Sequence, residues 1–568
     1  MWPRSRFLLY RERMLFNFFI AKLLAYFNIW KTSYVHTTKL GKVKGTVEYA
    51  ENGSKYYSFQ GIPYGKPMLG ENRFKTSEAA GPWTGTLDAT KTGKKSIQSH
   101  MVSKKLDGDE DCLNLNIYTP EVPPDSKNLR PVMVYIHGGA FLNGSNDKMM
   151  YGPDHLINED VVLVAINYRL GLLGFLAFED PSLGVTGNMG FKDMVLALKW
   201  VRVNIKDYNG DPDNVTIFGE SAGSVAVHLL MLSPLSKGLF HKVIAQSGSV
   251  LNGWSRCETD VAQQAASAIG FQSTSNKEIL DYFRTIPVDK LWAAQRALEK
   301  CDKFSCVDRF CGWTIEPPSN TAFLTKSPID LITSGEYNRV PIMMGFTNCE
   351  GMLYEGVVSE KNKPVYWEKP EVNVPTQLEL DNDSAVKKTV GEKIVKFYLG
   401  EGPYNKENST NSLYDLLTDN CFSWGIYQAV RHHANQLPNS VYLYRFSLDT
   451  KLNFYKHLTK ITSPGTSHAD DLAYLFNMSL SLGVSRHSLE DIARKRTCRL
   501  WANFAKFGNP TPKNDDLLDK LWLPVTKDIV NFYEISEDPH GDENPWPERM
   551  NFWNGIYSMN ENTAKLLK

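Results

Sequence analysis

A serine flanked by small residues stands where a predicted strand meets a predicted helix. Residues 219–223 (GESAG) follow the apolar run 215–218 and precede the helix-like run 224–232. Glycines two positions before and after the serine let the chain turn tightly from strand to helix. Such a turn lifts the hydroxyl clear of the sheet and sets the next N–H group at a helix start. Ser221 is therefore the candidate nucleophile.

A second loop of small residues lies earlier in the chain, at 137–141 (HGGAF), after the strand-like run 132–136. Acyl transfer passes through a tetrahedral oxyanion that preorganised backbone N–H groups must stabilise, and small residues let the backbone come close. The loop suits that role. Its two glycines and alanine suit a plain tight turn equally well.

A general base is expected after Ser221, because with this type of turn the chain order is serine, acid, histidine. The histidines that follow are His241, His432, His433, His457, His468, His487 and His540. His468 stands out, because small and polar residues at 465–467 and 469–471 place it in a loop. His432 and His433 lie in a polar run, 428–436, which we expect to form a solvent-exposed helix.

The candidate acid is Glu350, which follows the predicted strand 341–345 through residues 346–349 and precedes Gly351. This places a carboxylate just past the C-terminal end of a strand, where sites of α/β proteins are assembled. Three other carboxylates remain open as alternatives on these grounds: Asp330, Asp470 and Asp471.

The elements that must position these groups are short apolar strands alternating with helices. The strand-like runs are 132–136, 161–167, 215–218, 243–246, 341–345 and 441–445. Near-continuous apolar runs suit strands that are buried on both faces. Residues 190–203 have one broad apolar face, as a covering helix requires. The pattern predicts an α/β fold with a mostly parallel sheet flanked by helices, in one body without internal repeats.

Charge and composition exclude several classes of protein. The 568 residues hold 63 Lys and Arg against 63 Asp and Glu, and 42% are hydrophobic. A domain that binds nucleic acid through its phosphates is normally basic, so we expect no nucleic-acid partner. The charges are distributed unevenly along the chain, however. Residues 1–31 carry six basic side chains and one acidic, net +5, which leaves 57 basic and 62 acidic side chains, net −5, in the rest.

The basic N-terminal segment is predicted to be an amphipathic helix that meets a membrane surface. Its apolar stretch, 14–30, has 17 residues and one charge, Lys22, whereas a spanning helix needs about 20 apolar residues. No small-residue cleavage site follows Trp30, as a secretory signal would require. Polar and basic residues fall on stripes of a helical projection, which is typical of an interfacial helix. A spanning helix, or one packed on the protein body, remains an alternative.

Six motifs together resemble the type-B carboxylesterase and cholinesterase family. They are residues 110–118, 137–141, 209–223, 246–249, 348–351 and 465–471. The resemblance covers about 37 to 560 and is strongest to the insect α-esterases. It implies an α/β-hydrolase fold, with a catalytic domain over 37–560 after the N-terminal segment 1–31.

The same resemblance implies a role for each matched residue. Ser221 would be the nucleophile, Glu350 the acid of a Ser-His-Glu triad and His468 the base. The oxyanion hole would consist of the N–H groups of Gly139, Ala140 and Ala222. Two further polar groups, Glu220 and Ser247, would lie behind these residues.

Three departures from the family pattern bear on function. Ala140 stands where many members have a third glycine, so its methyl group narrows the oxyanion hole without removing a donor. Cys112 is the first of 8 cysteines and has no upstream partner of the kind that secreted members bridge, which argues against oxidative export. No aromatic choline site is recognisable between Pro63 and Asp107, which argues against acetylcholine as the substrate.

The expected activity is hydrolysis of small-molecule carboxylic esters through an acyl-enzyme, without a metal or organic cofactor. Alternatives are a lipase-like or sterol-ester hydrolase and a slow-turnover binder of hydrophobic esters and organophosphates. An adhesion protein is disfavoured, because such relatives lack the triad. We expect an intracellular enzyme of xenobiotic or lipid metabolism at the surface of the endoplasmic reticulum or of lipid droplets. Secretion is the alternative.

Overall fold

The computed structural model describes residues 32–100, 103–124, 127–257, 261–301, 310–356, 363–380, 384–400, 402–403, 405–479, 483–512 and 517–567. The predicted N-terminal amphipathic segment, 1–31, lies outside these residues.

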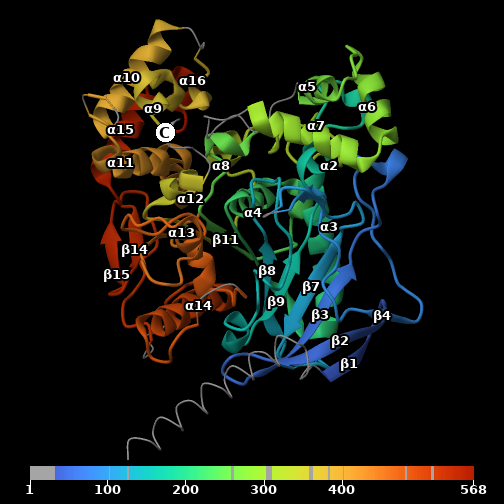
Figure 1. Cartoon of the computed structure of the whole chain (residues 1–568). Coiled ribbons are helices and arrows are strands. Elements are labelled where there is room, and N and C mark those ends of the chain that lie inside the picture. The colour runs from blue at the N-terminus through green and yellow to red at the C-terminus, as the bar shows by residue number, and fades with distance from the viewer. Residues whose placement is uncertain are drawn as a thin grey trace, which may run out of the picture.

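A 13-stranded sheet forms the centre of the fold (Figure 1). Its spatial order is β1 (Thr32–Thr38), β2 (Gly41–Tyr49), β3 (Lys55–Pro63), β7 (Asn114–Thr119), β9 (Val162–Ile166), β8 (Arg130–Ile136), β10 (Gly210–Glu220), β11 (Lys242–Gln246), β12 (Ile342–Thr347), β13 (Val441–Phe446), β14 (Asn531–Ile535) and β15 (His540–Glu543). β4 (Thr86–Asp88) pairs with β2. Neighbouring strands from β9 to β14 are parallel, and the pairs toward both edges are antiparallel. A separate two-stranded sheet joins β5 (Gln98–Ser99) to β6 (Leu106–Asp107).

The helices are α2 (Gly171–Phe175), α3 (Met189–Asn204), α4 (Ala222–Leu232), α5 (Val261–Ala268), α6 (Asn276–Thr285), α7 (Val288–Cys301), α8 (Pro328–Ser334), α9 (Val365–Glu368), α10 (Ala385–Tyr398), α11 (Lys406–Thr418), α12 (Trp424–Gln436), α13 (Phe454–Thr459), α14 (Leu489–Phe507), α15 (Pro547–Tyr557) and α16 (Glu561–Ala564). Among the described helices, none combines the length and the apolar character that crossing a membrane requires.

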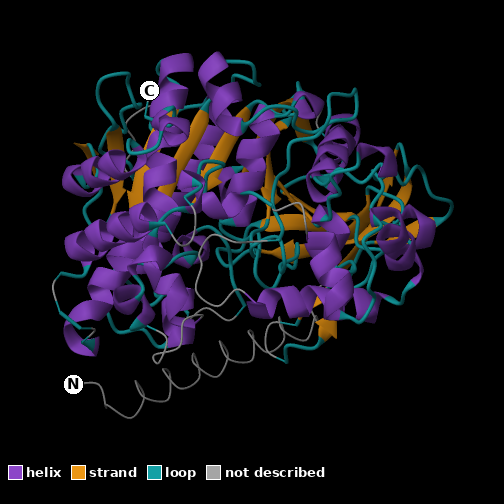
Figure 2. Ribbon diagram, turned by 90° about the horizontal axis from the view of Figure 1, so that it is seen from above, coloured by secondary structure: helices purple, strands orange, loops and turns teal. Residues whose placement is uncertain are grey.

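Helices cover both faces of the sheet (Figure 2). Side chains of β8 alternate between two apolar cores, because successive residues of a strand point to opposite faces. Val132 and Val134 lie in the core shared with α3, α4 and α12. Met133 and Tyr135 lie in the core shared with α14. This burial on both faces is why the central strands are continuous apolar runs.

The predicted α/β fold is confirmed. The six predicted strands coincide with β8 to β13, and the predicted helix at 190–203 lies within α3. The elements that sequence periodicity identifies are therefore the ones that carry the core.

The expectation of an exposed helix at 428–436 is wrong. This run belongs to α12, where His432 is 4% exposed and His433 is fully buried. His433 Nε2 lies 2.8 Å from His228 Nε2 on α4, and His432 Nε2 lies 2.8 Å from the carbonyl oxygen of Leu566. The helix is covered on one side by α4 and on another by the C-terminal segment, so hydrogen bonds to them replace water.

A buried ion pair joins the segment after β9 to α3. Arg169 Nη2 and Nε each donate to one carboxylate oxygen of Asp193 over 2.7 Å, and the backbone N–H of Arg169 donates to Oδ2 over 3.1 Å. The two side chains are 3% and 0% exposed. The pair therefore fixes the chain after β9 against the helix that covers the sheet.

Asp193→Asn should destabilise the fold strongly, because it leaves the guanidinium of Arg169 buried without a counter-charge. We expect the free energy of unfolding, measured by urea denaturation, to fall by about 3–5 kcal/mol. The control is Asp281→Asn, which breaks the exposed Lys277–Asp281 pair and should change stability little. An equal fall in the free energy of unfolding for the two variants would show that the buried pair contributes no more to stability than the exposed one.

Candidate active site

Ser221 occupies a sharp turn between β10, which ends at Glu220, and α4, which begins at Ala222. Its backbone has φ 60° and ψ −123°, a conformation that is strained for any residue with a side chain. A Cβ on Gly219 would lie 2.6 Å from the carbonyl oxygen of Gly223, and a Cβ on Gly223 would lie 2.1 Å from that of Ile136. Only glycine fits either position, so the two glycines permit the turn that the motif predicts.

The loop after β8 lies directly against this turn. A Cβ on Gly138 would lie 2.4 Å from the carbonyl oxygen of Glu220 and 3.0 Å from Cβ of Ser221. Gly139 and Ala140 both have positive φ, 99° and 58°. Within the described part of the chain, their N–H groups donate to no backbone carbonyl.

Ala222 is the first residue of α4, and the N–H groups of a first helical turn have no acceptor inside the helix. The N–H groups of Gly139, Ala140 and Ala222 thus have no backbone acceptor among the described residues. A helix N-terminus also favours negative charge. These are the groups that the family resemblance assigns to the oxyanion hole.

His468 is hydrogen-bonded to Glu350 over a distance of 2.6 Å, from Nδ1 to Oε2. Glu350 directly follows the loop after β12 and is completely buried. Its other oxygen, Oε1, accepts the N–H of Thr347 over 2.7 Å. Both oxygens of the carboxylate thus have a partner, which fixes the side chain and, through it, one nitrogen of the imidazole.

The other ring nitrogen of His468 faces the residue that precedes the serine. Nε2 lies 3.0 Å from Oε1 of Glu220. No hydrogen bond joins His468 to the Ser221 hydroxyl, both of which belong to the described chain. Catalytic hydrogen bonds are often long or poorly aligned until substrate is bound. The imidazole therefore lies at the turn, with its Nε2 beside the carboxylate of Glu220.

Two carboxylates control the charge of His468. Burial disfavours the imidazolium, but the charges and hydrogen bonds of Glu220 and Glu350 outweigh it and raise the pKa of His468 to about 10. The ring of Phe422 packs against the imidazole, with the ring centroids 4.7 Å apart. This environment stabilises a proton on the ring.

The three alternative acids have other partners. Asp470 accepts the backbone N–H groups of Tyr455 and Ser467, and Asp471 accepts the side-chain amide of Gln246 over 2.8 Å. Asp330 lies in α8, where its Oδ2 accepts the Ser327 hydroxyl. None of the three is hydrogen-bonded to His468, whereas Glu350 is.

Ser247 lies between the turn and Glu350. It follows β11, the strand between β10 and β12, and its N–H donates to the carbonyl oxygen of Gly345 in β12 over 2.8 Å. The N–H of Ser221 donates to the carbonyl oxygen of Gln246 over the same distance. The Ser247 hydroxyl is buried and has no hydrogen-bond partner among the described residues.

The site as a whole lies at the C-terminal ends of the central parallel strands. Residues 137–140, Ser221, Ser247 and Glu350 all follow the C-terminal ends of neighbouring parallel strands, β8, β10, β11 and β12. Parallel strands place these ends together, which is why four distant segments meet. In the described ranges, no three His, Cys, Asp or Glu side chains form a cluster that could hold a metal ion.

Cys112 is buried and has a free thiol.

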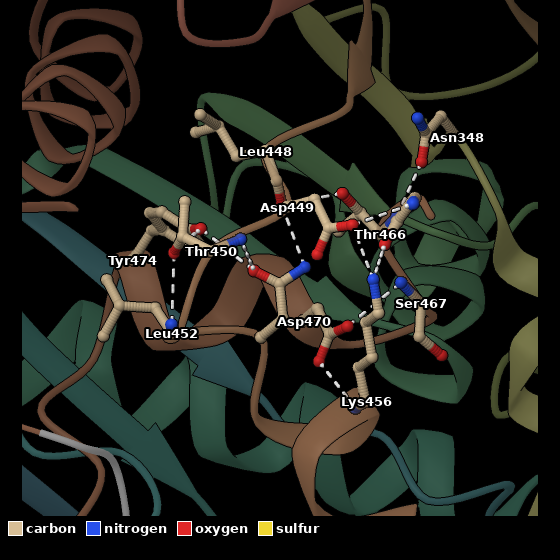
Figure 3. Close-up of polar contacts among 12 residues, drawn as sticks. Asn348, Leu448, Asp449, Thr450, Leu452, Lys456, Thr466, Ser467, Asp470 and Tyr474 are labelled. Atoms are coloured by element: carbon tan, nitrogen blue, oxygen red, sulfur yellow. Dashed lines mark hydrogen bonds and ion pairs between the residues drawn. The ribbon is translucent and has the colours of Figure 1, made fainter. Parts of the chain in front are cut away.

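Sequence reasoning missed the residues that hold the His468 loop. Asn348 Oδ1 accepts the N–H of Thr466 over 2.7 Å, and the Thr466 hydroxyl donates to the carbonyl oxygen of Leu448 (Figure 3). Asp449 and Lys456 also contact the loop. Their partners are distant or lie in irregular loops, so no local spacing marks them. Asn348 alone belongs to a recognised motif, 348–351.

Comparison with known proteins identifies the family of the chain. The model of the Carboxylesterase family matches residues 32–553. Esterase E4 of Myzus persicae is 34% identical over 515 residues, which are 88% of this chain and 90% of that protein. Juvenile hormone esterase of Tribolium castaneum is also 34% identical, over 84% of each chain.

Solved structures show the same fold. The crystal structure of juvenile hormone esterase from Manduca sexta, with OTFP covalently attached, superimposes with a TM-score of 0.81 at 29% identity and covers 93% of this chain and 100% of its own. Together with the family match over nearly the whole length, this shows that the chain belongs to the carboxylesterase family.

Proposed function

We propose that this protein hydrolyses carboxylic esters through an acyl-enzyme on Ser221, with His468 as the base and Glu350 as the acid of the triad. The observation that carries the proposal is the buried His468–Glu350 hydrogen bond beside a strained serine turn. Esters are the substrates named for its relatives, and the Manduca sexta relative carries a covalently attached OTFP. That covalent adduct supports covalent chemistry here.

In the first step, Nε2 of His468 takes the hydroxyl proton of Ser221 as the serine oxygen attacks the ester carbonyl. Glu350 holds the Nδ1 proton and stabilises the imidazolium that forms. The N–H groups of Gly139, Ala140 and Ala222 stabilise the oxyanion. The imidazolium then gives its proton to the leaving alcohol, which departs and leaves the acyl group on Ser221.

In the second step, His468 takes a proton from water, which attacks the acyl-enzyme. The same N–H groups stabilise the second oxyanion. Return of the proton to Ser221 releases the carboxylic acid and restores the enzyme. Apart from the attacking water, the proposed steps use side chains and backbone groups of this chain.

Glu220 adds a third charged group whose role is to set the pH range. Its carboxylate contacts the nitrogen that must be free to accept the serine proton. Because it stabilises the imidazolium, it makes the base stronger and also keeps it protonated to higher pH.

Ser221→Ala should lower kcat for p-nitrophenyl acetate at least about 10⁴-fold, because no other group can form the acyl-enzyme. Steady-state release of p-nitrophenol measures this. Ser182→Ala, at an exposed serine, is the control and should keep wild-type activity. If Ser221→Ala also kept it, the assigned nucleophile would be wrong.

Glu220→Gln should move the acidic limb of the kcat/KM–pH profile to lower pH. The base must be neutral, and removing the carboxylate lowers the pKa of His468, so the neutral form persists to lower pH. The profile is measured with a neutral ester, and Glu543→Gln, at an exposed position on β15, is the control. An unchanged or raised midpoint for Glu220→Gln would refute this role.

The N-terminal segment 1–31 is proposed to bind a membrane or lipid-droplet surface, on the strength of its net charge of +5 and its apolar residues. Deleting it should remove most of the binding to vesicles rich in phosphatidylserine, because basic residues near anionic lipid contribute about 1 kcal/mol each. Co-sedimentation measures binding, and vesicles of phosphatidylcholine alone are the control. Equal binding of the full-length chain and the chain without residues 1–31 to the anionic vesicles would contradict the proposal.

A further inference from the structure

The loop that carries His468 has little regular structure of its own. It runs from Lys460, which directly follows α13, to Ala469, and both residues have positive φ. Thr462 and Pro464 are exposed, whereas Thr466 and Ser467 are fully buried. A base on an irregular loop needs outside contacts to keep its ring within reach of the serine.

One residue of this loop, Gly465, is held through both of its backbone polar groups by an ion pair. Asp449 Oδ2 accepts the N–H of Gly465 over 3.0 Å, and Lys456 Nζ donates to the carbonyl oxygen of Gly465 over 3.0 Å. The same two side chains bind each other, with Nζ 2.5 Å from Oδ2. We call Asp449 and Lys456 the loop clamp (Figure 3).

The backbone conformation and the close surroundings of Gly465 favour glycine at this position. Its φ is 114°, and a Cβ here would lie 3.1 Å from Cβ of Cys349 and 3.2 Å from Oδ1 of Asn348. Gly465 is thus packed against the segment that leads into Glu350. Asn348 Oδ1 accepts the next N–H, that of Thr466, over 2.7 Å.

The short helix α13, which carries Lys456, is itself fixed at two places around the site. Asp470 Oδ1 accepts the N–H groups of Tyr455 and Lys456, while its Oδ2 accepts that of Ser467. The Tyr455 hydroxyl donates to the carbonyl oxygen of Leu353, in the helical turn that starts with Glu350. Helix α13 is therefore hydrogen-bonded to the chain before His468, to the chain after His468 and to the helical turn that begins with Glu350.

We propose that Asp449 and Lys456 are positioning residues that hold the His468 loop so that the imidazole keeps its contact with Glu350. This proposal rests on the triad proposed above. Neither residue is hydrogen-bonded to His468 itself, so each acts through the backbone of Gly465. The carboxylate of Asp449 is 39% exposed, whereas the side chain of Lys456 is 9% exposed, so the buried ammonium is the more restrictive half of the clamp.

The test compares Lys456→Met, Asp449→Asn and the double variant in the full-length chain. Lys456→Met should lower kcat for p-nitrophenyl acetate about 10- to 100-fold with KM within about threefold, because small displacements of a catalytic group cost rate rather than binding. Lys456→Arg should restore part of kcat. Because both residues hold the backbone of Gly465 and bind each other, the double variant should fall no further than the worse single variant.

Two readouts separate positioning from partial unfolding. Titration with diethyl p-nitrophenyl phosphate should still release one p-nitrophenolate per chain in Lys456→Met, but more slowly. The downfield proton resonance of the His468–Glu350 hydrogen bond should exchange with water faster than in the wild type. Lys451→Met is the matched control, because Lys451 belongs to the same segment but pairs with Glu490, and its kcat should be unchanged.

Unchanged kcat in Lys456→Met and Asp449→Asn would overturn the clamp, as would losses in the single variants that multiply in the double variant. A drop in kcat matched by an equal drop in the titration end point would overturn it too, because it would indicate loss of folded protein. If Lys456→Met does not fold, the kcat of Asp449→Asn decides whether the clamp exists, because the Asp449 side chain is more exposed and its replacement disturbs the fold less. These outcomes differ from failure of the proposed function, in which the wild type itself would release no p-nitrophenolate on titration.

Discussion

The hydrogen bond between His468 and the buried carboxylate of Glu350 is the interaction on which the rest of the site depends. A charge without solvent must be paired and hydrogen-bonded, and Glu350 meets this condition through His468 and the N–H of Thr347. The two residues are 118 positions apart. Only a scaffold that fixes both the end of β12 and the loop after α13 can keep the contact, and the parallel sheet provides the first of these.

The nucleophile depends on a constraint of a different kind, which is steric. Gly138, Gly219 and Gly223 let three stretches of backbone meet at distances that no Cβ would allow. The positive φ of Ser221 is tolerated because β10 and α4 are both held by the core on either side of it. The regular elements on either side thus support the strained serine.

Much of this could be predicted from the sequence, and the limits have a physical explanation. Apolar runs buried on both faces identify β8 to β13, and local spacing identifies the turn at Ser221. Glu350 could be separated from Asp470 and Asp471 only by resemblance, because each is a carboxylate near a candidate loop and spacing does not show which contacts the imidazole. The polar run 428–436 predicts an exposed His433, because sequence alone does not show its buried partners, His228 and Tyr337.

The same limit applies to the groups around the base. The sequence marks Glu220 as a neighbour of the serine, yet its contact with Nε2 of His468 comes from how the loop is folded. Asp449 and Lys456 have no motif at all, because their common partner is the backbone of Gly465. Hydrogen bonds to backbone groups leave no pattern of residue types, so this layer of the site appears only in three dimensions.

The measurement that tests the account most directly is the turnover of Glu350→Gln, which keeps the shape of the side chain but removes its charge. If Glu350 orients and stabilises the imidazolium, kcat for p-nitrophenyl acetate should fall by about 10⁴-fold, while circular dichroism shows a folded protein. A folded variant with kcat within about threefold of the wild type would contradict the central claim.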